Sequence, residues 1–395
     1  MTQPPPLPPP LPQAQRAHAP VAADRAMLQT TEQTRTYTCE SCGDNLVFEP
    51  ETAQLESPSC GRRYPIVVDP DATLPVHDLN TAMTALRQQQ ARGLAAPAVD
   101  KQVVCQSCGG KTIFSGTLTA VRCPYCNAPI QRTDVQDAPA RLAVDAVVPM
   151  RVGEQRARSE IERWIGKRWF APREFKRYRV LGSFTSVYMS YFSYDAQAFT
   201  EYTGERGDSY TVTDREGRQQ TRINWYRVRG RVRDDFENLT ELANGGLDGD
   251  KVRALEPWPV GDAEPYRPEF VAGHLARTYD GDAGQVFEAQ AKPRMESIIE
   301  GTIRRDIGGD YQRIHQRSTS FSMLNFMYVL LPLWLLTVTF SGKPFQVFVN
   351  GVTGEVSGQR PWSAVKIAAA VIAALVVVVI LVLLYRYYQA SGGTR

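Results

Sequence analysis

All seven cysteines of the chain fall between Cys39 and Cys126, and their spacing is that of metal ligands. The segment from Cys105 to Cys126 has the pattern CxxC, 14 residues, CxxC. This pattern is typical of a zinc ribbon, in which two tight turns with a short β-hairpin between them bring four thiolates together. Four thiolates leave no open position for water, so we expect a structural zinc ion. Its predicted ligands are Cys105, Cys108, Cys123 and Cys126.

The same module occurs twice, because CESCGDNLVFEPETAQLESPSCG aligns without a gap on CQSCGGKTIFSGTLTAVRCPYCN at an offset of 66 residues. Ser57 stands where the second copy has Cys123, so the first copy keeps only three of the thiols, Cys39, Cys42 and Cys60. A serine hydroxyl stays protonated and is a much weaker zinc ligand, which predicts a weakened or lost metal site. The alternative is a three-cysteine site completed from elsewhere, with Asp44 or His77 as the candidate ligand.

Modules of this size need a metal ion or packing against other parts of the chain to be stable. A ribbon of about 30 residues buries too little apolar surface to be stable alone, and zinc supplies on the order of 10 kcal/mol in such folds. In the first copy we expect apolar side chains to hold the fold instead, namely Leu46, Phe48, Leu55 and Tyr64. The predicted units are a degenerate zinc ribbon at 36–68, a helical linker at 69–102 and a zinc ribbon at 103–132. The linker helix has Asp78 as its N-cap, with Leu79, Met83 and Leu86 on one side.

Length and composition give the class of protein but not its activity. A chain of 395 residues with 43% hydrophobic residues is long enough for two or three domains, and a net charge of +3 gives no general attraction to nucleic acid. The sequence has no phosphate loop, dinucleotide fingerprint, nucleophile elbow or HExxH motif, and its four histidines are scattered. We therefore expect no enzyme, and an ATP-driven motor is excluded for this chain alone.

A core domain of the α+β class, with antiparallel strands, is expected at 143–362. In its first helix Ile161, Trp164, Ile165 and Trp169 recur at helical spacing. The stretch 151–180 is rich in arginine and aromatic residues. It is either an ordinary amphipathic helix with solvated arginines or a surface for phosphates or anionic lipid headgroups.

The rest of the core domain alternates as strands do, in SFTSVYMSYFSYDAQAFTEYTG, DSYTVTD and TRINWYRVRGRV, with TGERGD and DREG as expected turns. FVAGHLARTY and QAKPRMESIIEGTIRRDI are expected to be helices. The uncharged stretch 321–340 is long enough to span a membrane. Because strand-like alternation and turn signals follow it, we predict a buried hairpin of 327–340 and 344–349, with a membrane hairpin as the alternative.

One transmembrane helix is predicted at 365–386, since Ile367 to Tyr385 is uncharged over 19 residues, or about 28 Å of helix. A short tail, 387–395, follows, and a Pro-rich arm, 1–35, is expected to be disordered or a ligand for SH3 or WW domains. Flanking charges do not decide the orientation. Cysteine ligands require a reducing compartment, so we expect a single-pass protein of the cell inner membrane with its bulk in the cytoplasm.

Several motifs resemble a bacterial family of membrane-anchored tandem zinc-ribbon proteins, labelled TFIIB-type zinc ribbon or primosomal protein N′ (replication factor Y)-like. The motifs are RWFAP, VYMSYFSYDA, WYRVRG, PWPV, DIGGDYQRI, LLPLWLL and VNGVTGEVSGQRPWS. The resemblance covers about residues 36–386, and its similarity to primosomal proteins is confined to the ribbons. It implies a non-enzymatic adaptor that recruits SPFH (flotillin-like) and PspA-type proteins to the membrane. The alternative is a nucleic-acid-binding protein in which the ribbons and the 151–180 arginines contact phosphates.

Overall fold

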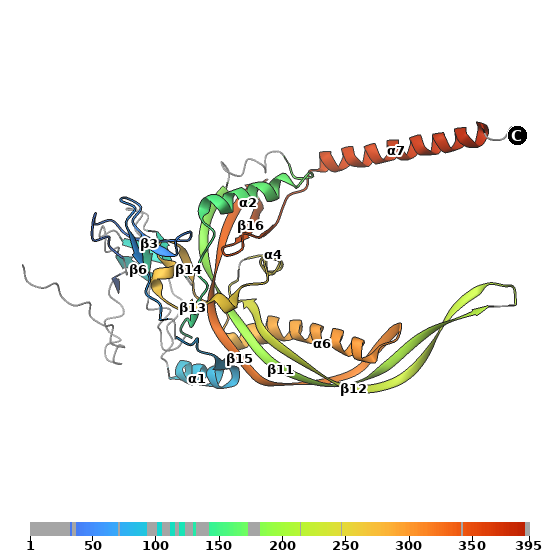
Figure 1. The fold of residues 1–395 in the computed structure, drawn as a ribbon, viewed down its shortest axis with the longest axis horizontal. Helices are drawn as coiled ribbons and strands as arrows, with labels where there is room; N and C mark the ends of the chain where they lie inside the picture. Colours follow the sequence, from blue (N-terminus) through green and yellow to red (C-terminus); the bar gives the residue numbers. More distant parts are fainter. Residues whose placement is uncertain are drawn as a thin grey trace, which may run out of the picture.

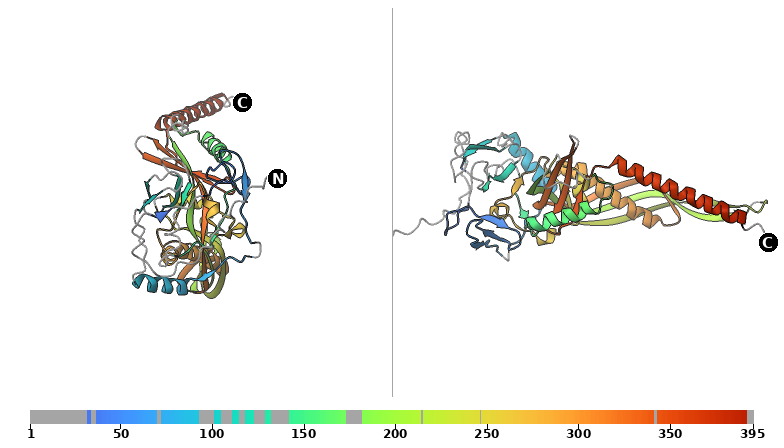
Figure 2. Two further views of the ribbon diagram at one scale, coloured as in Figure 1. Left: turned by 90° about the vertical axis from the view of Figure 1, so that its left-hand side faces the viewer. Right: turned by 90° about the horizontal axis from the view of Figure 1, so that it is seen from above.

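The structure, a computed structural model, describes residues 32–33, 37–69, 72–92, 101–104, 111–114, 118–122, 129–131, 142–172, 182–213, 215–245, 247–340 and 343–391. It is of the mixed α and β class expected, with mainly antiparallel strand pairs. Two long projections leave the body on the same side, a bent arm of strands and a single helix (Figures 1 and 2).

Three long strands form the spine of an 11-stranded sheet: β11 (Gly182–Thr213), β12 (Gln219–Leu242) and β15 (Tyr311–Phe340). The central strand β11 pairs antiparallel with β12 on one side and with β15 on the other. Near the body, β15 also pairs with β16 (Lys343–Asn350), which pairs with β17 (Val356–Gly358). The distal halves of the three long strands make the arm.

The expected turn at TGERGD is wrong, because β11 runs straight through it and the hairpin turns only at DREG. Gly204 and Gly207 allow the adjacent strands β15 and β12 to approach β11 closely. A Cβ on Gly204 would lie 2.3 Å from the Arg313 carbonyl oxygen, and one on Gly207 would lie 2.9 Å from the Trp225 ring. Glycine inside a strand can mark such a contact as well as a turn.

The predicted hairpin of 327–340 and 344–349 is confirmed as the pairing of β15 with β16. Leu330, Leu331 and Leu333 are completely buried in the sheet. The apolar stretch 321–340 is therefore a strand of the core, and its membrane-hairpin alternative is wrong.

Helices α1 (Leu79–Ala91), α2 (Glu154–Gly166) and α6 (Lys292–Ile307) lie against the body and the arm, whereas α7 (Ala364–Ser391) projects away from them (Figure 1). The linker helix α1 has the predicted N-cap, since Asp78 Oδ1 accepts from Thr81 N at 2.8 Å, and its buried face is the predicted one. Helix α6 is also confirmed and packs along the arm. Helix α2 buries Ile161 and Ile165, but Trp169 lies beyond its end and is 77% exposed, contrary to expectation.

The segment FVAGHLARTY is not a helix. It begins with the 3₁₀ turn η4 (Pro268–Val271) and continues as β14 (Leu275–Arg277), with Gly273 at φ +82° between them. β14 pairs with β11 and with β8 (Leu118–Arg122), which joins the segment to the second cysteine module. Pairing with neighbouring strands thus overrides the helical pattern of the local sequence.

The remaining elements are short. They are β1 (Glu32–Gln33), β2 (Val47–Glu49), β3 (Gln54–Glu56), β4 (Arg63–Pro65), β5 (His77–Asp78), β6 (Lys101–Val104), β7 (Lys111–Phe114), β9 (Pro129–Gln131), β10 (Ala146–Val147), β13 (Glu264–Pro265), α4 (Gly249–Arg253), α5 (Ala283–Val286), η3 (Val260–Asp262) and the π-helical η5 (Phe287–Ala291).

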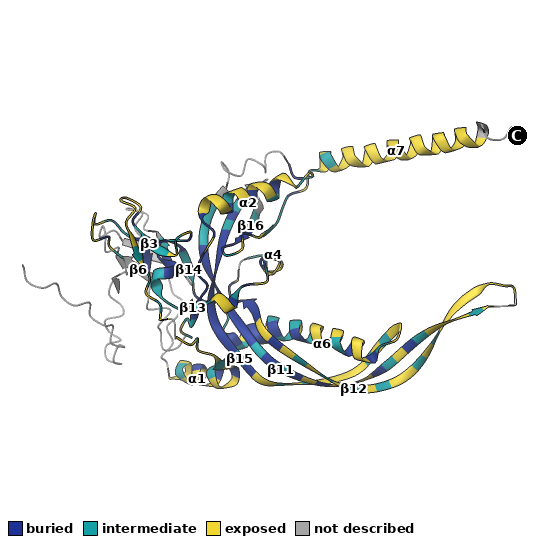
Figure 3. Cartoon of the chain, in the orientation of Figure 1, coloured by how far each residue is buried: buried dark blue, intermediate teal, exposed yellow. Residues whose placement is uncertain are grey.

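Buried residues concentrate where the long strands enter the body (Figure 3). This core is aromatic, and some of its hydroxyl groups are hydrogen-bonded: Tyr188 Oη accepts from Met150 N, and Tyr194 Oη donates to the Ala283 carbonyl. The buried Tyr191 Oη has no hydrogen-bond partner among the described residues. The core extends into the first cysteine module through Leu46, Phe48 and Leu55. The module is therefore packed on the body, and the body can stabilise it without metal.

Helix α7 (Ala364–Ser391) is the second projection. Within Ala364–Gln389 the most apolar stretch of 18 residues has a mean hydropathy of 3.5, and none of that stretch is buried against the rest of the chain. It is long and apolar enough to cross a membrane, as predicted for 365–386.

Candidate metal centre

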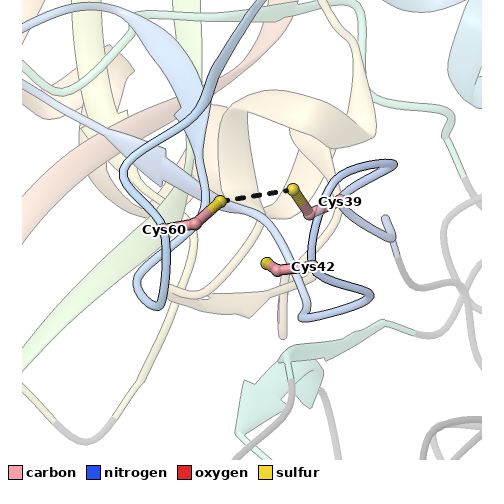
Figure 4. A group of neighbouring side chains, drawn as sticks. All are labelled: Cys39, Cys42 and Cys60. Carbon is pink, nitrogen blue, oxygen red and sulfur yellow. Dashed lines mark hydrogen bonds between the residues drawn. The ribbon is translucent and has the colours of Figure 1, made fainter.

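Three of the predicted ligands come together in the first cysteine module. The sulfur atoms of Cys39, Cys42 and Cys60 all lie within 4.8 Å of one another, and Figure 4 shows them converging from two loops. Cys39 Sγ and Cys60 Sγ are 3.6 Å apart. Two thiolates on one tetrahedral zinc ion are about 3.8 Å apart, so the spacing fits a shared ion. Within the described part of the chain, these three cysteines form a cluster of ligands that could hold a metal ion.

Ser57 takes the place of the fourth ligand. Its Oγ lies 3.3 Å from Cys42 Sγ, close to the roughly 3.5 Å expected between an oxygen and a sulfur ligand of one zinc ion. The residue is completely buried, and its Oγ also accepts from Cys60 N at 3.4 Å. The hydroxyl is therefore aimed into the cluster, and the donor set is three sulfurs and one oxygen.

Two matching turns present these ligands. Gly43 N donates to the Cys39 carbonyl at 2.9 Å, and Gly61 N donates to the Ser57 carbonyl at 2.8 Å. Both glycines have positive φ, +75° and +68°, which other residues adopt at a cost. β2 pairs with β3 between the turns, and β3 pairs with β4 across the second one. The first copy thus has the predicted hairpin between its turns.

Tyr64 belongs to the site, although the sequence indicated only a packing role for it. Its Oη lies 3.4 Å from Cys39 Sγ and accepts from Glu40 N at 3.0 Å. The hydrogen bond from Tyr64 lowers the pKa of the Cys39 thiol to about 6, against the opposing effect of burial. At Cys42 the Ser57 hydroxyl lowers the pKa, but the other two cysteines and burial raise it more. The Tyr64 hydroxyl thus favours the thiolate form of Cys39.

Neither alternative fourth ligand is at the site. Asp44 accepts from Ser59 Oγ and Asn45 N, which holds its pKa below the usual value. His77 lies on β5, where its Nε2 is 2.8 Å from Asp145 Oδ1. Asp145 is nearly buried, and burial raises its pKa despite the contact with His77. His77 therefore fixes the linker to the core.

The other predicted ligands, Cys105, Cys108, Cys123 and Cys126, lie outside the described residues. The strands that flank them are described, and they differ from the expected hairpin between the two CxxC turns. β7 pairs with β6 in a three-stranded sheet, whereas β8 pairs with β9 in the large sheet. Each CxxC therefore lies between two strands that pair with each other.

Comparisons with known proteins find one curated relative that matches over most of the chain. It is described as "Uncharacterized protein YdjG" of Bacillus subtilis (strain 168) and is 24% identical over 343 residues, which cover 84% of this chain and 92% of the relative. No protein-family model matches the chain, and no solved structure matches it.

The chemistry of this centre is that of a small, solvent-facing metal site. Cys39 is buried, but Cys42 and Cys60 are exposed, so a cation can enter from solvent. Soft thiolates select zinc or a similar soft ion, and a neutral hydroxyl binds such an ion far less firmly than a fourth thiolate. The donors fit a structural ion that is held loosely.

Proposed function

We propose that this chain is a non-enzymatic adaptor that is anchored in the membrane by α7 and carries zinc ribbons. The observation that supports this best is that α7 contains an uncharged, apolar stretch of 18 residues, none of which is buried against the rest of the chain. Such a stretch is unstable in water, and a helix of this length satisfies its own backbone inside a bilayer.

The cysteine sites support an architectural role. The first site tolerates a serine among its ligands and sits on a module whose inner side is packed into the core. The predicted second site, with four thiolates, would hold Zn²⁺ without an open position for a substrate. In the first module Cys42 and Cys60 are exposed, so its outer face is open to other proteins.

The orientation and the partners follow from the cysteines and from the resemblance. Thiolate ligands persist in a reducing compartment, which puts the ribbons and the core on the cytoplasmic side of the inner membrane. Proteins of the SPFH and PspA types are the partners that the resemblance implies. The adaptor would hold them at the bilayer surface.

The test is recruitment to vesicles. Purified SPFH-type or PspA-type protein should float with vesicles that contain the full chain and should stay behind when α7 is deleted. Replacing Ile367–Tyr385 by an equally long polyleucine helix is the matched control, and it should preserve recruitment. If neither partner floats with the full chain while the chain itself does, the recruiting function is wrong.

Nucleic-acid binding is the other class of function to separate. Several arginines on and near α2 are already paired, Arg158 with Glu154, Arg163 with Glu160 and Arg151 with Asp262, which leaves less charge for phosphates. Binding to DNA would show a steep salt dependence that is reduced by Arg156→Ala, Arg163→Ala and Arg168→Ala. A flat titration with salt would favour the adaptor.

A further inference from the structure

The base of α7 is attached to the loop that follows α2. Ser363 N donates to the Phe170 carbonyl at 2.8 Å, and the rings of Phe170 and Trp362 are 6.2 Å apart. Lys366 Nζ donates to the carbonyls of Trp169 and Ala171 at 3.0 and 2.8 Å. Two segments almost 200 residues apart in sequence therefore form one surface next to the apolar helix. We call it the collar, and it comprises Lys167, Arg168, Trp169, Phe170, Arg360 and Trp362.

The collar exposes large aromatic side chains that the core does not use. Trp169 is 77% exposed and Trp362 is 59% exposed, and both adjoin the point where α7 becomes apolar. At the other end of α7, Tyr385, Tyr387 and Tyr388 are also exposed. The helix rises about 30 Å between Val365 and Tyr385, which is the thickness of the hydrocarbon layer. Tryptophan and tyrosine gather at the two interfaces of a bilayer, so both ends of α7 carry the expected aromatic residues.

The collar is also basic. The Arg168 guanidinium lies 4.5 Å from the Trp164 ring, and that of Arg360 lies 4.2 Å from the Trp362 ring. Arg168 Nε is buried and has no hydrogen-bond partner in the described part of the chain. Within the same part, no carboxylate forms an ion pair with Lys167, Arg168 or Arg360. Lys167 is exposed and Arg168 and Arg360 are half-buried, so these residues add positive charge to the collar.

The charge of the arm limits how the body can meet the bilayer. In Figures 1 and 2 the arm and α7 leave the body on the same side, and the arm carries exposed charged residues such as Arg218, Arg222 and Arg229. A charged side chain is strongly disfavoured inside the hydrocarbon, so the arm cannot share the layer that α7 spans. In a membrane α7 must turn away from the arm beyond Trp362. The collar and α2 then face the bilayer surface, and the arm stays outside the hydrocarbon.

We propose that the collar is a second membrane contact, a surface that binds anionic phospholipid headgroups with its basic residues and inserts Trp169 and Trp362 at the interface. The inference rests on the proposed anchoring by α7. It adds that the cytoplasmic body lies against the bilayer and is not loosely tethered to it. Each basic residue at an anionic surface contributes about a fivefold change in binding.

Tryptophan fluorescence tests the aromatic part. The full chain is placed in nanodiscs of phosphatidylcholine and phosphatidylglycerol, with or without bromine on the acyl chains near the interface. Bromine should quench part of the emission, and Trp169→Phe and Trp362→Phe should each reduce the quenched part. Trp225→Phe is the matched control, because Trp225 lies on the arm under Arg313, and it should leave quenching unchanged. Emission that bromine does not change would overturn the inference.

Flotation separates this inference from the proposed function. A chain that does not float with vesicles overturns both the anchoring by α7 and the collar. A chain that floats but whose Trp169 is unquenched overturns the collar alone.

Lipid charge tests the basic part. Quenching should rise when phosphatidylglycerol is added to pure phosphatidylcholine. The double variant Lys167→Gln, Arg360→Gln should need a several-fold higher fraction of anionic lipid for the same quenching. Arg215→Gln, Arg218→Gln at the tip of the arm is the control of equal charge and should behave as the unchanged chain. Equal quenching with and without anionic lipid would overturn the choice of anionic headgroups.

Discussion

The two cysteine modules share one spacing in the sequence but differ in how many thiols they contribute and in how their strands pair. The first has Cys39, Cys42 and Cys60 with the Ser57 hydroxyl in the fourth place, whereas the second has four cysteines in its sequence. At the offset of 66 residues Tyr64 also corresponds to Ile130, which has no hydroxyl group. The first site thus has two hydroxyl oxygens, of Ser57 and Tyr64, that the second copy lacks. The second copy has one additional thiol, that of Cys123.

The first module shows what can replace a metal ligand. Phe48 N donates to the Ala272 carbonyl, and His274 Nε2 donates to the Phe48 carbonyl at 3.1 Å. The Phe48 ring packs edge-on to Phe270 and is only 1% exposed. A module held by the core in this way can lose a thiolate and keep its fold, which explains physically why serine is tolerated there.

The largest effect is expected from Phe48→Ala. Removing a buried phenyl ring should cost about 3–5 kcal/mol, and the loss should fall on the first module. Urea unfolding of the detergent-solubilised chain measures the free energy, and limited proteolysis after Tyr37 locates the loss. Phe114→Ala is the same change at the equivalent position of the second copy. If Phe48→Ala leaves the unfolding midpoint unchanged, the core does not stabilise the first module.

Exchanging the fourth ligand should exchange the metal affinities. Cys123→Ser should weaken zinc binding at the second module by more than the roughly 10- to 100-fold that loss of an outer-shell partner costs, because a direct ligand is lost. Ser57→Cys should strengthen the first site by a comparable factor. Zinc per chain, measured in competition with a chelator of known affinity, reports both. Equal zinc retention by the unchanged chain and Ser57→Cys would show that Ser57 does not limit the site.

Tyr64→Phe should have a smaller effect, confined to the first site. It removes the hydroxyl that bonds to Cys39 Sγ but keeps the ring, so the loss of affinity should be about 10- to 100-fold. Zinc or cobalt titration of the Ser57→Cys background, where binding is tight enough to measure, gives the ratio. A change at the second site would indicate a general disturbance and would contradict the assignment of Tyr64 to the first.

Much of the fold could be predicted from local patterns. The cap at Asp78 marked α1, and the apolar alternation before Asn350 marked the pairing of β15 with β16. The cysteine spacing was enough to bring three sulfurs together. These features depend on residues that are close in sequence.

The features that could not be predicted depend on distant neighbours. Gly204 and Gly207 allow contacts with β15 and β12, which a single strand does not reveal. The segment around Gly273 became a strand because β8 and β11 pair with it. Tyr64 has no counterpart in the second copy that would have indicated a role at the metal.

The smallest predicted effect concerns the linker between the modules, which His77 and Asp145 fix to the core. Burial raises the pKa of Asp145, so the folded state favours the protonated carboxyl. This contribution to stability is fully present below the ordinary pKa of 3.8 and is lost as the pH rises through the raised value. Asp145→Asn cannot ionise, so the stability of the unchanged chain should fall relative to the variant as the pH rises from about 4 to about 7. Urea unfolding at both pH values measures the difference, and a difference independent of pH would show that the carboxyl is not perturbed by its burial.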